Sequence, residues 1–375
     1  MISFVWSAKY PFYAGAGGSE NYTAGHIREL ARRGIPSRII TLGHSEDDGR
    51  KDFPDIQFLA LDDKKQLSEL DDTLIFITYP LAVTTKRPNY TILHCPPPSY
   101  AHNDPLYNLK AMHGTNLIAT SKFASRMWRS YLGPSFRVQV VYPFAENDFA
   151  CVERKAKTDP CTDILFAGRL TPDKGIYTLL ASIHMLNTRE LNYKLTVTTA
   201  GGHCDEGKII LPLVKAHPQI NVVPARRNAK AMAELMASQD IVVMPSTDIF
   251  WREMFGIVSV EAQHAGCRVV AARSGGLPET NCGGLHIIKS DNPKALAQGL
   301  VYVAGLPPLT ITERSNAANK YTVEKSVDRL LSVITQQRKI ALPHADGRLL
   351  ADLQPNLRLL GGRLKQSGLL ADHRI

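Results

Sequence analysis

Short β-rich runs alternate with helical stretches along this chain, and the alternation starts again in its second half. This pattern predicts parallel sheets whose strands are joined by crossover helices, so the expected fold class is α/β. In the first half the expected strands are residues 2–6, 37–42, 74–78, 91–94, 116–120 and 138–142, with a helix over 20–33. In the second half they are residues 163–167, 193–200, 221–223, 241–244 and 268–272, with helices over 175–187, 229–237, 256–265, 293–303 and 321–334.

A polar, proline-containing stretch interrupts the alternation between residues 145 and 162. The chain has 375 residues, and a domain of ordinary size has roughly 150. We therefore expect two facing Rossmann-like, doubly wound domains with a cleft between them, over residues 1–150 and 151–336. For residues 337–375 we expect a tail that packs back on the first domain or is disordered, because Pro355 and two glycines interrupt any long amphipathic face that could contact a membrane.

Composition excludes several classes of protein. No apolar run approaches the roughly 20 residues that span a bilayer, and the N-terminus lacks a basic leader, so we expect a cytoplasmic protein, with peripheral contact with the inner face of the membrane as an open alternative. The six cysteines form no Cys-x-x-Cys pair, which indicates reduced thiols. The net charge of +9 suits a polyanionic ligand, but no nucleic-acid-reading motif is present, so we expect no nucleic-acid partner.

Two glutamates, Glu253 and Glu261, lie eight positions apart around the start of an expected helix. If the helix opens at Phe255 and Gly256, Glu253 lies in the loop at its positive end and Glu261 about one and a half turns inside it. The first backbone amides of the helix can bind phosphate oxygens, and the carboxylates can accept hydrogen bonds from hydroxyl groups. An ordinary amphipathic helix with an exposed glutamate is the alternative.

Other candidate residues also follow expected strands, where doubly wound sheets place their ligand-binding loops. Arg169 and Lys174 would be two cations beside the cleft. Gly17 and Gly18 follow the first strand and open a helix, where missing side chains let backbone amides approach a ligand. His94 follows another strand; a structural hydrogen-bonding role is its alternative. No cluster of acidic residues and histidines is built for a metal, so we expect no metal site.

These motifs together resemble the large family-4 retaining glycosyltransferases, which have the GT-B fold and a Glu-x7-Glu signature. Glu253 and Glu261 match the signature, and further family motifs occur in the right order over residues 1–336. The matching segments are Gly17-Gly18-Ser19-Glu20, Tyr142-Pro143, Gly168-Arg169-Leu170 with Lys174-Gly175, Asp240 to Ser246, and Gly275-Gly276-Leu277-Pro278-Glu279.

The resemblance implies a hexosyltransferase that moves a sugar from a nucleoside-diphosphate sugar to a hydroxyl acceptor and needs no cofactor. It implies His94, Arg169, Lys174 and Glu253 as catalytic residues. The donor-binding residues that it implies are Gly17, Gly18, Arg169, Lys174, Arg226, Glu253, Phe255, Gly256, Ile257, Val258 and Glu261. A uridine diphosphate sugar is the first expectation for the donor and guanosine diphosphate mannose the second. The acceptor, a glycan, a lipid-linked sugar or a small metabolite, would bind the first domain near residues 96–100 and 102–107.

Two alternatives stay open at this stage. The strand–loop–helix repeats also suit a nucleotide-dependent oxidoreductase, although Glu20 stands where the third glycine of a dinucleotide-binding loop would be. The second alternative is a non-catalytic protein that binds a nucleotide sugar, against which the presence of all four polar signature residues argues. Binding of a reduced nicotinamide cofactor would favour the first alternative.

Overall fold

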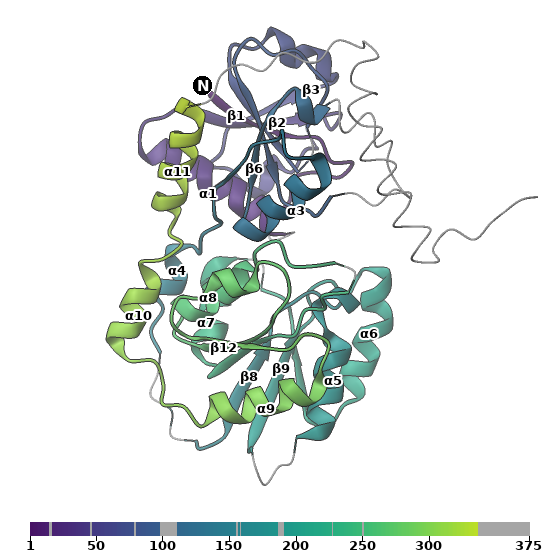
Figure 1. The fold of residues 1–375 in the computed structure, drawn as a ribbon, viewed down its shortest axis with the longest axis vertical. Helices are drawn as coiled ribbons and strands as arrows, with labels where there is room; N and C mark the ends of the chain where they lie inside the picture. The colour runs from purple at the N-terminus through teal and green to yellow at the C-terminus, as the bar shows by residue number, and fades with distance from the viewer. Residues whose placement is uncertain are drawn as a thin grey trace, which may run out of the picture.

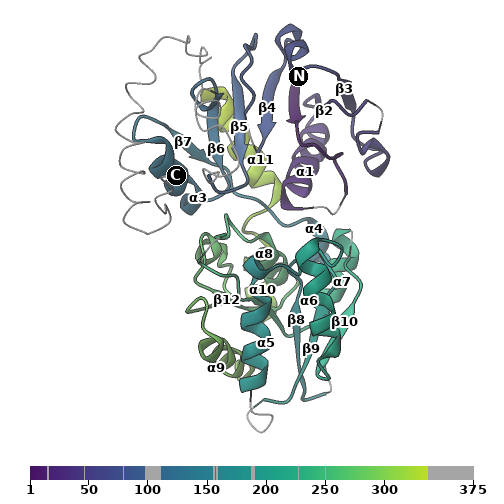
Figure 2. The ribbon, with the colours of Figure 1, turned by 90° about the vertical axis from the view of Figure 1, so that its right-hand side faces the viewer.

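The computed structural model describes residues 1–336 except 15–16, 46, 79, 98–110, 155–156, 158, 187–190, 227 and 250. Its strands form two sheets, both entirely parallel in the described pairs, which lie one above the other in two perpendicular views (Figures 1 and 2). This arrangement confirms the expected α/β class with two doubly wound sheets. Two expected features, the tail over 337–375 and most of the acceptor loop, lie outside the described residues.

The first sheet has the strand order β3-β2-β1-β4-β5-β6-β7, and the second has the order β10-β9-β8-β11-β12-β13. The strands of the first sheet are β1 (Ile2–Trp6), β2 (Ser37–Leu42), β3 (Phe58–Leu61), β4 (Thr73–Ile77), β5 (Asn89–Leu93), β6 (Asn116–Ala119) and β7 (Val138–Val140). Those of the second are β8 (Thr162–Phe166), β9 (Tyr193–Thr198), β10 (Ile220–Val223), β11 (Ile241–Met244), β12 (Arg268–Ala272) and β13 (Leu285–Ile288).

Helices cover both sheets. The described α-helices are α1 (Gly18–Arg32), α3 (Lys122–Leu132), α4 (Asn147–Cys151), α5 (Ile176–Met185), α6 (Asp205–Ala216), α7 (Ala229–Ala237), α8 (Ile257–His264), α9 (Pro293–Ala304), α10 (Ile311–Ala318) and α11 (Val323–Gln336). Short 3-10 helices lie between them: η1 (Arg50–Asp52), η2 (Lys64–Glu69), η3 (Pro172–Lys174) and η4 (Leu277–Thr280). We call the first sheet with its helices the N-terminal unit and the second the C-terminal unit.

Strand β11 shows why both faces of the second sheet are buried. Side chains alternate between the two faces of a strand. Ile241 and Val243 lie in one core, with side chains of α5, α6 and α9. Val242 and Met244 lie in the other, with side chains of α7 and α8. A strand buried on both faces needs a continuous apolar run, which is the pattern of residues 241–244.

Helix α11 crosses back to the N-terminal unit. Its apolar residues Val327, Leu330 and Val333 are buried in the same core as Phe4 and Ile75 of the first sheet. Figure 1 shows α4, α10 and α11 along one side of the molecule, with α11 beside the upper sheet. The expected second domain, residues 151–336, therefore includes a helix, α11, that packs on the first sheet. Sequence periodicity marks an apolar face but not the sheet that covers it.

Some elements were absent from the sequence expectations. The edge strands β3 and β13 have four residues each, and their mostly half-buried side chains show little of the periodicity that identifies a strand. Helix α6 contains Pro212 in its interior, which argues against a helix in a sequence pattern. Helices α3 and α10 were also missed. All of these lie between or beside the expected elements and leave the parallel order unchanged.

Candidate functional site

Three of the predicted site residues lie where the second sheet reverses its strand order. Strand β8 lies beside β11, with β9 and β10 on one side and β12 and β13 on the other. Ligands of open α/β sheets bind outside the carboxyl ends of the strands at such a reversal. Arg169 and Lys174 follow β8, and Glu253 lies in the loop that follows β11. The strand order thus supports this position as the candidate site.

Lys174 and Glu253 are in direct contact. The Lys174 Nζ atom donates to Glu253 Oε1 at 2.5 Å, and their side chains are 17% and 12% exposed. Ser246, directly after the strand-end proline, donates its hydroxyl to the same Oε1 atom at 3.0 Å. The Asp173 carboxylate lies 3.7 Å from Lys174 Nζ. This arrangement offers a shielded ammonium group beside a carboxylate that can accept hydrogen bonds from a polar ligand.

A glycine allows the loop after β8, which holds Lys174, to approach the loop after β11, which holds Glu253. Gly175 has φ +75° and directly precedes α5 as its N-cap. A Cβ atom at this position would lie 1.9 Å from the carbonyl oxygen of Pro245, so a larger residue would push the loops apart. The backbone amide of Thr247 donates to the Asp173 carbonyl at 3.0 Å. The Lys-Gly pair therefore supplies both the cation and the close approach that brings it to Glu253.

Helix α8 begins shortly after Glu253 in the chain. Gly256 precedes the helix with φ 94° and provides no side-chain cap for its amides, an arrangement that can bind an anion through the backbone. Ile257 and Val258 are half-buried in the first turn. The Phe255 ring is 3% exposed and packs against Tyr142 and Tyr321, so only the backbone of this predicted donor-binding residue can approach a ligand.

Glu261 lies in the second turn of α8 and differs chemically from Glu253. Burial, with a smaller contribution from the nearby Glu146 carboxylate, raises the pKa of its carboxyl group to about 8. Burial also raises the pKa of Glu146, which precedes α4. Glu261 is therefore mostly protonated at neutral pH in this structure and can donate as well as accept a hydrogen bond.

Arg169 is exposed, and its charge acts on two residues of the N-terminal unit. Burial raises the pKa of Glu20 in α1, and the positive charge of Arg169 opposes this rise. Arg169 acts in the same way on Cys95, which follows β5. Gly17 and Gly18 lie at the start of α1, and a Cβ atom on Gly17 would lie 3.1 Å from Glu20 Oε2. The charge of Arg169, after β8, thus acts on Glu20 in α1 and on Cys95 after β5.

His94 directly follows β5, and its ring makes an edge-to-face contact with Tyr22 at 5.1 Å between centroids. Burial, with a smaller effect of His26, lowers the pKa of His94 to about 3. Its Nε2 atom is buried and has no hydrogen-bond partner among the described residues. The imidazole is therefore neutral near pH 7 and can form a hydrogen bond but carries no charge.

Arg226 lies apart from these residues. It is exposed in the loop after β10, and β9 separates that strand from β8. Arg227 and the acceptor-loop residues 98–110 are outside the described part of the chain. Within the described part of the chain, Lys174 and Glu253 are in contact, and no hydrogen bond or ion pair joins Arg226 to them.

Two polar residues at the site had no expected role. Ser246 contacts Glu253, and the sequence marked it only as the last residue of the matching segment Asp240 to Ser246. Glu279 lies in the Gly-Gly-x-x-Glu loop after β12, and its carboxylate accepts hydrogen bonds from backbone amides of the other unit. A motif match singled out this loop, but no local pattern indicates what its glutamate contacts.

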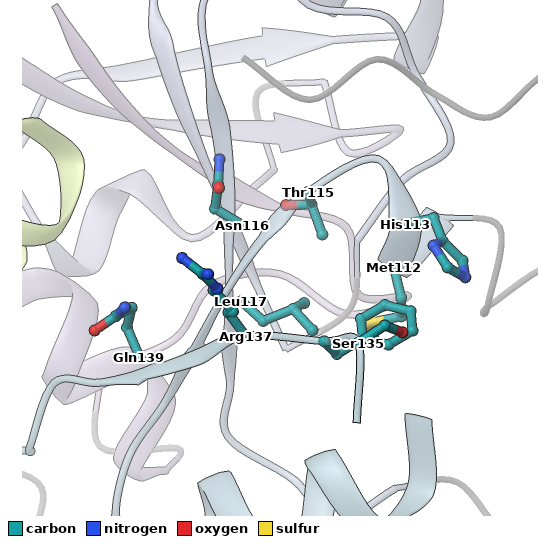
Figure 3. A pocket seen from close by; sticks show the side chains of 9 residues that line it. Met112, His113, Thr115, Asn116, Leu117, Ser135, Arg137 and Gln139 are labelled. Carbon is teal, nitrogen blue, oxygen red and sulfur yellow. The ribbon is translucent and has the colours of Figure 1, made fainter. Parts of the chain in front are cut away.

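A cavity of about 300 Å³ lies elsewhere, between the amino ends of β6 and β7 (Figure 3). Thr115, Leu117 and Arg137 are among its lining residues. None of its lining residues is a predicted site residue. The candidate residues of the N-terminal unit, such as His94, follow the carboxyl ends of its strands, so this cavity lies at the opposite end of the strands from them.

The described ranges contain neither a cluster of metal ligands nor a membrane-spanning helix. They contain no group of three or more histidine, cysteine or acidic side chains that could hold a metal ion. Within the same ranges no helix combines the length and the apolar character needed to cross a bilayer. All six cysteines are free thiols.

Comparison with known proteins identifies the C-terminal unit. Residues 161–305 match the family described as glycosyl transferases group 1. This unit is a group 1 glycosyltransferase domain. Lys174, Ser246, Glu253, Glu261 and Glu279 all lie within it. The match covers less than half of the chain, and the N-terminal unit lies outside it.

Curated relatives of the group 1 domain have varied names. A D-inositol 3-phosphate glycosyltransferase of Streptomyces griseus is 31% identical over 171 residues, covering 41% of this chain and 34% of that protein. A lipopolysaccharide 1,2-N-acetylglucosaminetransferase of Salmonella typhimurium is 32% identical over 127 residues, covering 32% of each chain. The chain thus spans about a third of the length of these two relatives.

Solved structures match over nearly the whole chain and show its fold. A glycosyltransferase from Rickettsia africae superimposes with a TM-score of 0.68 at 16% identity, covering 89% of this chain and 97% of that one. HepE from Anabaena, solved with UDP and glucose, superimposes with a TM-score of 0.64 at 17% identity, covering 90% and 99%. The group 1 domain and the N-terminal unit together therefore form the GT-B fold.

Proposed function

We propose that this chain is a retaining glycosyltransferase that moves a hexose-type sugar from a nucleoside-diphosphate sugar to an acceptor hydroxyl. The observation that carries the proposal is the contact of Lys174 and Ser246 with Glu253 at the strand-order reversal. A diphosphate needs cations, a sugar needs hydrogen-bond acceptors, and this point of the fold provides both. The group 1 match of the surrounding residues supports the same conclusion.

In this proposal each polar residue contacts a different part of the donor. Lys174 and Arg169 bind the diphosphate, together with the backbone amides of Gly256, Ile257 and Val258. Glu253 accepts hydrogen bonds from hydroxyls of the transferred sugar. Glu261 binds the nucleotide ribose, and its protonated form can donate a hydrogen bond to a ribose oxygen.

The reaction breaks the bond between the sugar's anomeric carbon and the diphosphate oxygen and forms a bond from that carbon to the acceptor oxygen. The leaving diphosphate gains negative charge as the bond breaks. Lys174 and Arg169 therefore stabilise the transition state more than the bound donor. Attack from the face that the diphosphate leaves retains the configuration, and the diphosphate oxygen takes the acceptor's proton.

The acceptor binds the N-terminal unit in this proposal. His94 directly follows β5 and is neutral. In this proposal it forms a hydrogen bond to the transferred sugar or the acceptor and supplies no charge. Contact between the two units would exclude water, which otherwise competes with the acceptor hydroxyl. A glycan, a lipid-linked sugar or a small metabolite all meet the requirement for a hydroxyl group.

Uridine diphosphate sugars are the favoured donors, and guanosine diphosphate mannose is the second candidate. HepE from Anabaena, which has the same fold, was solved in complex with UDP and glucose, and this supports the order of preference. The names of the curated relatives include both an inositol phosphate and a lipopolysaccharide glycosyltransferase. They therefore favour no single acceptor class.

The test is release of nucleoside diphosphate from a panel of donors, with and without candidate acceptors, followed by NMR of the product's anomeric centre. We expect one donor to be consumed faster with acceptor and the product to keep the donor's anomeric configuration. An inverted product would overturn the retaining mechanism. Failure of every nucleotide sugar to bind in calorimetry, with binding of a reduced nicotinamide cofactor instead, would overturn the proposed function.

A further inference from the structure

Two segments connect the units, and they are joined to each other. The first includes Tyr142 and Ala145, between β7 and α4; the second includes Tyr321 and Ser326, between α10 and the first turns of α11. The Ala145 amide donates to the Tyr321 carbonyl at 3.1 Å. The Ser326 hydroxyl donates to the Tyr142 carbonyl at 2.6 Å. The two connections therefore form one paired junction.

Glu279 of the C-terminal unit contacts both connections and helix α3. Its carboxylate accepts from the Tyr142 hydroxyl at 2.8 Å, and its carbonyl accepts from the Tyr321 hydroxyl at 2.5 Å. The same carboxylate accepts from the backbone amides of Lys122 and Phe123 at 2.9 and 2.6 Å. One side chain thus joins the C-terminal unit to the N-terminal unit and to the junction between them.

Glu279 supplies the acidic group that the first turn of helix α3 lacks. Ser121 caps the amide of Ala124 at 2.9 Å, but the amides of Lys122 and Phe123 are bound by Glu279. A carboxylate at the positive end of a helix forms charge-assisted hydrogen bonds. Since the carboxylate comes from the other unit, this cap exists only while the two units keep their present arrangement.

The Glu279 loop also holds the backbone beside the candidate donor site. The Gly276 amide donates to the Glu253 carbonyl at 2.7 Å, and a Cβ atom on Gly275 would lie 2.0 Å from that carbonyl oxygen. From the N-terminal unit, the Ser121 hydroxyl donates to the carbonyl of the next residue, Met254, at 2.5 Å. Hydrogen bonds therefore connect the start of α3, the Glu279 loop and the backbone at Glu253 and Met254 to one another.

We propose that Glu279 is a positioning residue that holds the N-terminal unit at a fixed spacing from Glu253. Its role in catalysis rests on the proposed function, because the spacing matters for transfer only if donor and acceptor bind opposite units. Glu279 itself does not contact the reacting atoms. It acts through α3 and the junction, so its loss changes the arrangement of the units and leaves the donor site's own side chains in place.

The test compares the full chain with Glu279→Ala and Glu279→Gln. Glu313→Gln is the matched control, because Glu313 also caps a helix through the Thr310 amide but does so within the C-terminal unit. Hydrogen exchange at Lys122 and Phe123 should become about tenfold faster in Glu279→Ala. It should increase less in Glu279→Gln, whose amide retains one acceptor oxygen, and stay unchanged in Glu313→Gln. The radius of gyration from small-angle scattering should increase more in Glu279→Ala than in Glu279→Gln, and it should stay unchanged in Glu313→Gln.

The activity measurement is the transfer rate with the donor and acceptor that the panel identifies. We expect turnover in Glu279→Ala to fall about tenfold, with binding of the free nucleoside diphosphate within about twofold of the parent. Unchanged exchange at α3, an unchanged radius of gyration, or unaltered turnover in an expanded variant would each overturn the proposal. If the parent transfers no sugar, the proposed function fails. A larger radius of gyration in Glu279→Ala would then still support the role of Glu279 in arranging the units, and an unchanged radius would overturn that role.

Discussion

Lys174 Nζ lies 2.5 Å from Glu253 Oε1, although 79 positions separate the two residues in the chain. Their side chains are largely shielded from solvent, so each charge is compensated mainly by the other and only weakly by water. Removing one partner of such a pair leaves the remaining charge poorly compensated. The cation proposed for the diphosphate and the carboxylate proposed for the sugar therefore form one coupled pair, which has consequences for mutagenesis.

Substitution of Lys174→Ala should lower turnover on the order of a hundredfold or more, because a preorganised cation stabilises the departing diphosphate. Lys194→Ala is the control, since Lys194 forms an exposed ion pair with Asp159 at 2.7 Å. Steady-state kinetics and thermal unfolding of both variants provide the measurement. A folded Lys174→Ala variant with near-normal turnover would remove Lys174 from the site.

The double variant Lys174→Ala with Glu253→Gln should lose less activity than the product of the two single losses. The two side chains contact each other, so the second substitution acts on an interaction that the first has already broken. The same kinetic assay over the four proteins of the cycle measures this coupling. Fully multiplicative losses would mean that the ion pair is absent when the donor is bound.

The two signature glutamates should differ in their effect on product binding. Glu261→Ala should weaken calorimetric binding of free nucleoside diphosphate, because ribose contacts persist when the sugar is absent. Glu253→Ala should lower turnover and sugar discrimination but leave that binding almost intact, since the product lacks the sugar. Equal weakening in both variants would show that Glu253 is misplaced.

The raised pKa of Glu261, about 8, makes folding stability depend on pH. The folded protein holds a proton that the unfolded chain, with a carboxyl pKa near 4.5, releases earlier. The stability from this group is therefore fully present below pH 4.5 and is lost as pH rises to 8. Relative to Glu261→Gln, which mimics the protonated group, the wild type should lose about 1–3 kcal/mol across this range, allowing for partial exposure. Thermal unfolding of the wild type and of Glu261→Gln at pH 5, 7 and 9 provides the measurement. If the stability of the two proteins changes with pH in the same way, the raised pKa of Glu261 is wrong.

Gly175→Ala should destabilise the protein on the order of 2 kcal/mol or more, because the new Cβ atom needs a left-handed backbone and meets the Pro245 carbonyl at 1.9 Å. Gly305→Ala is the matched control, with φ −77° and its nearest neighbour at 3.5 Å. Urea unfolding measures the difference. Similar midpoints for the two variants would argue against the close approach of the two loops.

Activity should survive an excess of chelator. The proposal assigns stabilisation of the leaving diphosphate to Arg169 and Lys174, so no divalent ion is needed for that step. The donor assay with a chelator, and then with magnesium or manganese added back, provides the measurement. Loss of activity that one divalent ion specifically restores would contradict this expectation.

The sequence by itself determined the local features of this protein. The alternation of β-rich runs, such as residues 241–244, with helical stretches predicted a parallel α/β architecture. The same alternation placed Arg169, Lys174 and Glu253 in loops after strands. These features follow from periodicity and backbone conformation, which act over a few residues. The tertiary structure alone decided that β8 lies beside β11, that α11 packs on the first sheet, and that Glu279 binds the α3 amides. Each of these depends on which distant surfaces pack together, and that choice is made by the fold as a whole because no short stretch of sequence contains both partners.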